Sequence, residues 1–460
     1  MQLHNAPDVD RSWGTVRRFR VAVVGLVGAV TLAVGAAAAM PVAAQTKSPA
    51  PKATEIGVTA TEIRIAVVAD VDNPFSPGLF QGVVDGVQGA VKYINSKAGG
   101  GGIAGRKLVV DFMDSKLNAN QARNAVITAC SQDLALVGTA ALFLSTAEDI
   151  TSCKDQAGAA TGLPDVGAIV GTSEGCSPAS FPVNPPAVLC NTLDQHPQKY
   201  QGNQGAFKRL VQQHKNDLHG AMVFSNDTQT AAAGGKGLIA LFVHAGAKAD
   251  QNVGISGRAP QSAYTPIVQS MKQDGSNLGY STVALSGTLE WRNEATLQGI
   301  SNSAVTWVVP SGGYDKALKQ NASAMDGTYI VMNFLPFEEA SSNAMLANFL
   351  KYVGPDKANG FAVYGFTAGI AFSDALKDVV AKHGINGITR STVLAGLGTL
   401  TKFDAGGMVG TTNIAQKISS SCTMLEQFKA GKFVRSWPAK QGTFDCKPAN
   451  YVILEEDLTG

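Results

Sequence analysis

The stretch "LFQGVVDGVQGAVKYINSKAGGGGIAGRKLVVDF", residues 79–112, decides the fold class of this chain. Within it, Gly100, Gly102 and Gly105 have the G-x-G-x-x-G spacing of loops that bind a dinucleotide pyrophosphate. Such a loop follows a strand and opens a helix, so that the helix N-terminus faces the phosphate. Here the order is reversed, because a helical apolar pattern precedes the glycines and the strand pattern "KLVVDF" follows them. The glycines therefore predict a turn between a helix and a strand, and no cofactor is expected.

Strands and helices alternate on both sides of this stretch. Strands are expected first at 62–70, 134–137 and 166–170, with helices at 119–130 and 145–156. A second series of strands is expected at 219–225, 246–256, 281–287, 304–310 and 328–334. Strands that alternate with helices form parallel sheets covered by helices. The sequence therefore predicts an α/β protein with two doubly wound parallel-sheet lobes.

The N-terminus has the pattern of an export signal. Four arginines precede the apolar run 21–39, and the small residues 42–44 follow it as a cleavage pattern. We therefore assign residues 1–44 to the signal and residues 45–61 to a flexible tether, and expect a soluble protein outside the cytoplasm. The alternative is a retained membrane anchor, because the apolar run approaches the roughly 20 residues that span a bilayer.

The charge balance argues against a polyanionic partner. Removing the four arginines and two aspartates of residues 1–44 from the totals of 37 basic and 35 acidic residues leaves 33 of each sign. A chain without excess positive charge has no electrostatic footprint for nucleic acid or anionic lipid. No nucleic acid is therefore expected as a partner.

Six cysteines in an exported chain indicate disulfides. Fifteen pairings are possible in principle, but the positions fall into three local pairs. We expect bonds that join Cys130 to Cys153, Cys176 to Cys190, and Cys422 to Cys446. No C-x-x-C or H-E-x-x-H pattern occurs in the sequence, so no metal site is expected.

Several motifs, in this order, resemble one known family. "GLFQG" leads into a helix that ends in "YIN", then come "GGIAGRKL" and "VDFMDSK", and later "DLALVGTAALFLSTAE", "SAYTPIVQSMKQDG" and "YGFTAGIAFSDAL". This order resembles the type I periplasmic binding proteins, in the branch of the leucine/isoleucine/valine-binding proteins, over roughly residues 56–446. The resemblance implies an ABC importer protein that captures a small organic solute between two lobes and delivers it to membrane permease subunits, as a monomer.

The resemblance also implies three crossovers between the lobes, with hinges near Asp217, Phe334 and Thr401. Lobe one would then comprise residues 62–217 with 334–401. Lobe two would comprise residues 218–333 with 402–460.

Ligands of parallel α/β sheets bind at the carboxyl ends of the strands. In the resembled family, hydroxyl and N–H groups in the loops after the third and fourth strands hold a ligand carboxylate; the alternative for such residues is plain turn chemistry. From lobe one we expect contributions from Asn73, Phe75, Ser76, Thr139, Ala140, Leu142, Phe143, Thr172 and Ser173. From lobe two we expect Asn226, Asp227, Ser286 and Ser311.

The sequence departs from the resembled branch in both lobes. Leu142 and Phe143 stand where leucine-binding relatives carry serines. "PSGGYD", residues 310–315, lacks the acid that pairs with a ligand ammonium group in those relatives, although Asp227 or Asp315 could substitute. An unpaired ammonium in a closed cleft is costly. We therefore expect a solute that is amino-acid-like or more apolar, such as an amide or a branched-chain compound, and less charged than free leucine.

Two other functions are compatible with parts of the sequence. "GTSEG", residues 171–175, matches the G-x-S-x-G nucleophile elbow of hydrolases, with Ser173 as the nucleophile. The elbow requires a helix next, whereas four prolines follow between residues 178 and 186, and no histidine is marked as a base. We therefore expect no enzyme. An extracellular sensor that acts on a receptor remains the other alternative.

Overall fold

The computed structural model describes residues 49–73, 76–144, 147–195 and 198–455. The export signal expected over residues 1–44 and the site residue Phe75 lie outside these ranges. Within them, no helix has both the length and the apolar character that crossing a bilayer would require.

The first sheet has four strands in the order β2-β1-β3-β4, all parallel. Strand β1 lies inside the sheet because its sequence EIRIAVVA is buried along most of its length, and Ile65 pairs with Val110 on one side and Ala135 on the other. The strands are β1 (Glu62–Ala69), β2 (Lys107–Asp114), β3 (Ala135–Val137) and β4 (Asp165–Val166). This parallel order confirms the α/β prediction for the first lobe.

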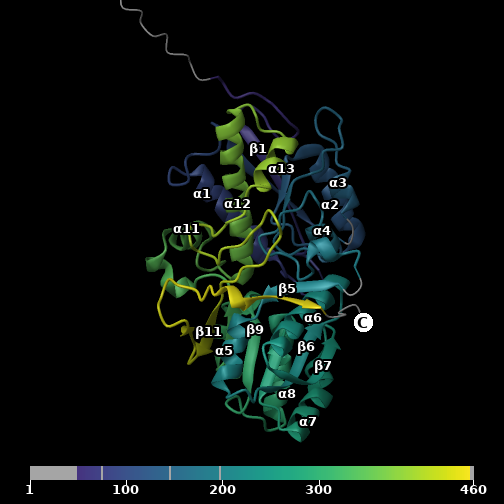
Figure 1. The fold of residues 1–460 in the computed structure, drawn as a ribbon, viewed down its shortest axis with the longest axis vertical. Helices are drawn as coiled ribbons and strands as arrows, with labels where there is room; N and C mark the ends of the chain where they lie inside the picture. The colour runs from purple at the N-terminus through teal and green to yellow at the C-terminus, as the bar shows by residue number, and fades with distance from the viewer. Residues whose placement is uncertain (1–48, 74–75, 145–146, 196–197, 456–460) are drawn as a thin grey trace, which may run out of the picture. The chain divides into compact units, whose positions relative to one another are not determined.

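The helices around this sheet come from two distant parts of the chain (Figure 1). The first group is α1 (Gln81–Asn95), α2 (Ala119–Gln132), α3 (Glu148–Thr151) and α4 (Thr172–Gly175). The second group is α11 (Ala344–Val353), α12 (Gly360–His383) and α13 (Arg390–Leu397). Helix α12 packs along α1, and in Figure 1 the two lie side by side next to β1.

Glycines set the distance between α1 and α12. A methyl group at Gly86 would lie 2.1 Å from the Ala362 carbonyl oxygen, and one at Gly365 would lie 2.0 Å from the Val83 carbonyl oxygen. Both distances are far below van der Waals contact, so only glycine allows the two backbones to approach this closely. Helix α1 thus holds α12, a helix that lies more than 260 residues further along the chain.

The glycine loop after α1 forms the expected turn. Gly100, Gly101, Gly102 and Gly105 all have positive φ, at 102°, 82°, 116° and 78°. The Gly102 amide donates to the Ile94 carbonyl at 2.9 Å and so closes the C-terminal end of α1. This geometry is typical of glycine after a helix, and the prediction of a turn instead of a phosphate-binding loop is confirmed.

The second sheet has seven strands in the order β12-β11-β10-β9-β8-β6-β7. Strands β6 to β10 run parallel, and β11 and β12 extend the sheet as an antiparallel hairpin. The strands are β6 (His219–Ser225), β7 (Lys248–Ile255), β8 (Leu278–Ser281), β9 (Thr306–Pro310), β10 (Tyr329–Met332), β11 (Met424–Lys429) and β12 (Lys432–Trp437). The helices that accompany them are α5 (Gly205–Gln213), α6 (Gln229–His244), α7 (Thr265–Asp274), α8 (Leu285–Leu297), α9 (Ala317–Gln320) and α10 (Ala322–Met325).

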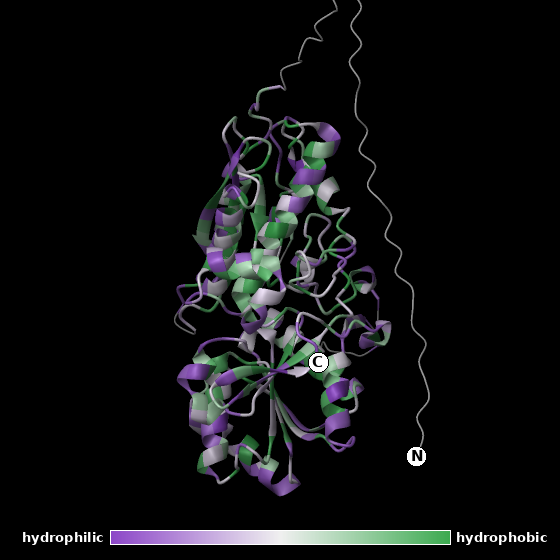
Figure 2. Ribbon diagram, turned by 90° about the vertical axis from the view of Figure 1, so that its left-hand side faces the viewer, coloured by the Kyte–Doolittle hydropathy of each residue, from purple (hydrophilic) through white to green (hydrophobic). Residues whose placement is uncertain are grey.

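Hydrophobic and hydrophilic residues alternate along the helices around both sheets (Figure 2). A small third sheet pairs β5 (Lys199–Asn203) with β13 (Tyr451–Glu455). The short 3₁₀ helices are η1 (Cys190–Thr192), η2 (Gln261–Tyr264), η3 (Ser311–Gly313), η4 (Phe337–Ser342) and η5 (Pro448–Asn450).

Three local expectations need correction. Residues 281–287 were expected to be a strand, but β8 ends at Ser281 and α8 begins at Leu285. Helix α5 lies within residues 62–217, which are expected in lobe one, but its apolar face is buried in the same core cluster as β6. Residues 52–58 belong to no tether, because Thr54 donates to the Ile388 carbonyl at 2.6 Å and Val58 is buried.

All three expected disulfides are present: Cys130–Cys153, Cys176–Cys190 and Cys422–Cys446. The first joins the end of α2 to the chain just after α3, and the second closes the proline-rich loop that follows α4. The Cys130–Cys153 bond closes a loop of 23 residues. Closing a loop of this length lowers the entropy of the unfolded chain and so stabilises the fold by about 3 kcal/mol.

We predict that titration of the denatured, unreduced protein with a thiol reagent detects almost no free thiol, and that prior reduction releases six. The double variant Cys130→Ser/Cys153→Ser should lose about 3 kcal/mol of unfolding free energy in urea titrations. Several reactive thiols in the exported, unreduced protein would contradict both the pairing and the export assignment.

Candidate functional site

The described site residues lie at the carboxyl ends of parallel strands or just beyond them. In the first sheet they follow β1, β3 and β4, and in the second sheet they follow β6, β8 and β9. Loops at this edge of a parallel sheet are where α/β proteins bind ligands. The hydrogen bonds and the exposure of each residue show which of their polar groups remain available to a ligand.

The loop after β1 is shaped by Asn73. This side chain is buried; its amide oxygen accepts from the Ser76 amide at 2.8 Å, and its amide nitrogen donates to the Ser76 carbonyl at 3.1 Å. Asn73 therefore shapes this turn through hydrogen bonds to Val71 and Ser76 of its own loop. The Ser76 hydroxyl lies at the partly exposed end of that turn.

Thr139 and Ala140, which follow β3, are corrections to the predicted site. The Thr139 hydroxyl is fully buried and donates to Asp165 at 2.6 Å, and the Ala140 amide donates to the Val68 carbonyl at 2.9 Å. The Ala140 amide is used because single bridges to Ala69 and Ile169 continue the strand pairing three residues past the end of β3, and the Thr139 hydroxyl is used by the Asp165 carboxylate. Neither is free to hold a ligand carboxylate.

Asp70, which sequence reasoning missed, organises the strand ends. It accepts from the Ser115 hydroxyl at 2.6 Å, the Leu117 amide at 2.8 Å and the Leu142 amide at 2.8 Å. These bonds fix the loops after β2 and β3, so that Leu142 and Phe143 remain partly exposed. Burial raises the pKa of Asp70 despite these hydrogen bonds. An acid directly after a buried strand was the available sequence signal.

Thr172 and Ser173 begin the short helix α4, although the prolines had been expected to exclude a helix here. Those prolines start only at Pro178, one turn later, so a single helical turn fits before them. Ser173 is exposed, and no described residue hydrogen-bonds to its hydroxyl or to that of Thr172. These two hydroxyls are therefore available to a ligand.

The described histidines do not form a catalytic pair with Ser173. The hydrogen-bonded ones contact other groups: His214 contacts Thr306, His219 contacts Asp250, and His244 contacts Gln204. A serine nucleophile needs a base within hydrogen-bond reach. The described part of the chain therefore offers no support for the hydrolase alternative.

Two buried acids lie behind the first-lobe loops. Asp165 accepts from Thr139 and Ser180, both at 2.6 Å, and burial raises its pKa to about 6. Glu174, the third residue of α4, is also fully buried, and burial together with Asp165 raises its pKa well above the usual range. Both were missed at the sequence level because burial of an acid depends on the tertiary packing.

The second lobe contributes fewer free groups than predicted. Asp227 accepts from Ser256 and from the Gly257 amide, both at 2.6 Å, and these bonds outweigh burial and lower its pKa. Asp227 is therefore a loop-forming residue. Asn226 is exposed after β6, and Ser286 is exposed in the first turn of α8.

Loops from the two sheets meet, among other described contacts, at Gly171 and at Ser311. A methyl group at Gly171 would lie only 3.1 Å from the Thr230 hydroxyl oxygen, so the loop before α4 touches the first turn of α6. Ser311, which follows β9, shares a hydrogen bond with the Tyr364 hydroxyl of α12. Ser311 therefore links the sheets. Thr230, absent from the prediction, joins Thr172 and Ser173 in the first contact zone.

Comparisons with known proteins agree with this architecture. A family model described as "Periplasmic binding protein" matches residues 62–431. No curated protein sequence matches the chain.

Similar solved structures include an ABC transporter substrate-binding protein from Aeropyrum pernix (TM-score 0.65, 14% identity, covering 84% of this chain and 97% of that one). A fatty acid ABC transporter substrate-binding protein from Thermomonospora curvata has a TM-score of 0.64 and 14% identity, covering 86% of this chain and 98% of that one. The branched-chain amino acid transporter substrate-binding protein of Streptococcus pneumoniae, in complex with isoleucine, has a TM-score of 0.58 and 18% identity, covering 82% of this chain and 100% of that one.

The raised pKa of Asp165 predicts that stability falls as pH rises. Its pKa is about 6 in the folded protein and 3.8 as the ordinary value, so the folded state binds the extra proton between these limits. Its contribution is present below pH 4 and is lost as pH rises through 6. The unfolding free energy should therefore drop by about 1 kcal/mol from pH 5 to pH 8 on account of this group.

Urea titrations at both pH values check this prediction. The variant Asp165→Asn should show a smaller pH dependence than the wild type. Asp274→Asn, at the exposed end of α7, should leave the dependence unchanged. An unaltered slope in Asp165→Asn would show that Asp165 titrates in the folded protein as it does in the unfolded one.

Proposed function

Because the chain belongs to the periplasmic binding protein family, we propose that it is the extracytoplasmic solute-binding component of an ABC importer. One observation carries this proposal: strand-end loops from two separate sheets meet at Gly171 and Thr230, beside the unpaired hydroxyls of Thr172 and Ser173. A small organic solute bound there would touch both lobes. The similar solved structures are ABC transporter substrate-binding proteins, which supports the same class of function.

Capture would work by lobe closure. A solute that contacts both lobes only when they are together favours the closed state, and a few backbone torsions at the crossovers are sufficient for the rotation. We place these hinges before β5, at Phe334 and near Thr401. No covalent step and no cofactor is required, and the partners would be the membrane permease subunits.

The environment of the two second-lobe acids, Asp227 and Asp315, supports a solute without a free ammonium group. Asp227 is bonded within its own loop, and Asp315 accepts from the Ala317 amide at 2.8 Å. Both carboxylates already accept hydrogen bonds within their own loops. In contrast, Leu142 and Phe143 keep partly exposed apolar surface in the first-lobe loop. We therefore propose a solute that is more apolar than leucine. Its polar end would bond the Thr172 and Ser173 hydroxyls.

Calorimetry with leucine, isoleucine and valine should show weak binding or none, because a buried ammonium without a carboxylate partner is costly. Mass spectrometry of solute released from natively purified protein should identify a more apolar molecule. Sub-micromolar binding of any of the three amino acids would contradict the proposed solute class but not the transport function. Turnover of simple esters would contradict the transport function.

The variant Ser173→Ala should weaken binding of the identified solute without affecting folding. Loss of one hydrogen bond costs about 1 kcal/mol for a neutral partner and up to about 3 kcal/mol for a charged one. Calorimetry gives the affinity, and thermal unfolding gives the stability.

Ser391→Ala is the matched control, because Ser391 is an exposed serine of α13 that is not at a strand end. Its affinity should equal that of the wild type. If Ser173→Ala binds as tightly as the wild type, or fails to fold, Ser173 serves only the local turn.

A further inference from the structure

A cavity of about 310 Å³ lies away from the strand-end loops, between η4 and the β11–β12 hairpin. Its volume is at the lower end of the range for small-molecule sites. Its walls combine acidic, basic and apolar side chains: Pro336, Glu338, Glu339, Glu426, Phe433, Val434, Arg435, Ala439 and Gln441. None of these residues belongs to the solute site proposed above.

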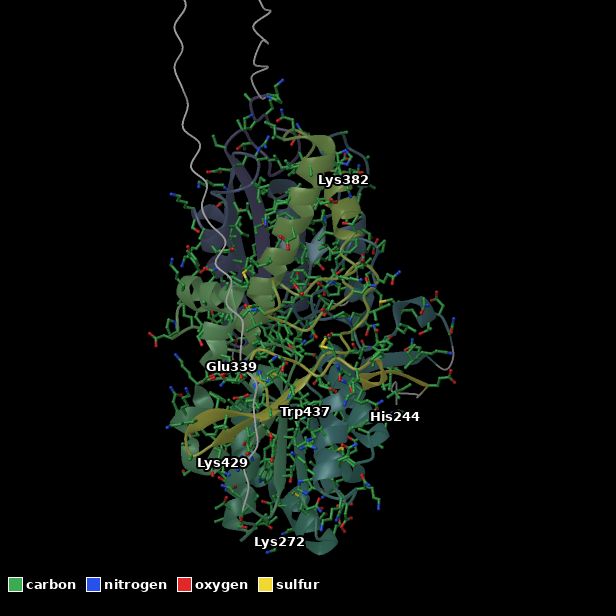
Figure 3. The ribbon with its side chains drawn as sticks, turned by 60° about the vertical axis from the view of Figure 1, so that its left-hand side comes forward. His244, Lys272, Glu339, Lys382, Lys429 and Trp437 are labelled. Carbon is green, nitrogen blue, oxygen red and sulfur yellow. A yellow bond between two sulfur atoms is a disulfide. The ribbon has the colours of Figure 1, made fainter. Side chains whose placement is uncertain are left out.

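Glu339 and Arg435 neutralise each other in this wall. The Arg435 guanidinium forms a two-pronged ion pair with the Glu339 carboxylate, with Nη2 at 2.6 Å from Oε2, and both side chains are buried. Figure 3 shows Glu339 beside the hairpin strands that carry Lys429 and Trp437. The Gly442 amide donates to the same carboxylate at 2.8 Å. The charges of Glu339 and Arg435 therefore cancel and leave no net charge with which a ligand could pair.

Glu426 has no such partner. It is only 1% exposed, it lines the cavity, and no described residue donates to its Oε2 atom. Arg435 lies opposite Glu426 in the strand register, but its remaining nitrogen, Nη1, donates to the carbonyls of Pro438 and Thr443. A buried carboxyl group at the wall of a cavity, without a cation, is energetically costly unless it is protonated.

Glu338 adds a second acid at the rim. Its carboxylate accepts from the buried Tyr314 hydroxyl, and the Lys319 ammonium is 3.8 Å away and half exposed. Burial raises the pKa of Glu426 to about 8, the nearby Glu338 and Glu339 act in the same direction, and Arg435 opposes them. The wall therefore has one more acid than the cations can compensate.

An adjoining cavity of the same volume provides a contrast. It shares Glu338 and Phe433 with the first, but its other charged residues are Asp315, Lys316 and Lys319. Two acids are balanced there by two lysines. The uncompensated charge is thus specific to the cavity that contains Glu426.

We propose that the cavity at Glu426 binds a small organic cation, of the primary alkylammonium class. Its three N–H donors would bond Glu426 and Glu338, and its carbon chain would lie against Phe433 and Pro336. Aromatic rings attract cations as well as alkyl groups, and the Phe433 ring already has the Lys319 ammonium 5.2 Å from its centre. The bound ammonium group would supply the missing positive charge. Glu426 would then release its proton to solvent and become ionised.

Calorimetric titration of the exported protein with n-butylammonium chloride tests this site. The neutral control ligand is 1-butanol, which has a carbon chain of the same length. The alkylammonium should bind and the alcohol should not. Affinity should rise about tenfold between pH 7 and pH 9, because the ionised fraction of Glu426 rises while the ligand keeps its charge. An affinity that does not change with pH, or equal binding of the alcohol, would overturn the proposal.

The variant Glu426→Gln should fold, because glutamine resembles the protonated acid in shape and charge, and should lose at least tenfold in affinity for butylammonium. Glu290→Gln, the same change on α8 outside the cavity, should bind as the wild type does. If Glu426→Gln fails to fold, Phe433→Leu should still lower the affinity severalfold. Wild-type affinity in either cavity variant would refute the site.

Discussion

The backbone contact between α1 and α12 is the constraint on which the rest of the structure depends. Gly86 and Gly365 allow each helix to reach a carbonyl group of the other, so α12 must sit against the first sheet's own helix. The N-terminal end of the same α12 reaches the second sheet, where the Gly360 amide donates to the Tyr314 carbonyl at 2.9 Å. One helix from the late part of the chain thereby fixes the first lobe and contacts the second.

Buried acids have the corresponding role at the strand ends. Asp70 holds the loops after β2 and β3, and Asp165 holds Thr139 and Ser180. Each bond uses a polar group that would otherwise be available to a solute. The loop after β4 is the exception, because its two hydroxyls are left unpaired among the described residues. The solute site that we propose therefore has few free polar groups, which fits a solute with one polar end.

The sequence was sufficient for features that depend on local patterns. Helical spacing over 79–97, the glycine turn and the three cysteine pairs all involve residues close in the chain, and the structure confirms them. Features that depend on residues far apart in the chain could not be predicted from local sequence patterns. The Thr139 hydroxyl is consumed by an acid 26 residues later, and Ser311 by a tyrosine 53 residues later. Residues 281–287 alternate as a strand does, but sheet pairing ends at Ser281 and helical packing takes over.

The two contact zones between the sheets differ in strength, and this difference bears on how the lobes separate. Near Ser311 the lobes are joined by hydrogen bonds to α12, from the side chain of Tyr364 and the backbone of Gly360. At Gly171 and Thr230 the two loops approach closely, but no hydrogen bond joins these two described residues. The Ser311 zone also lies next to Phe334, where we propose a hinge. A rotation about that hinge would keep the hydrogen bonds of the Ser311 zone and move the loop of Thr172 and Ser173 away from α6, on the side where the proposed solute would bond these hydroxyls.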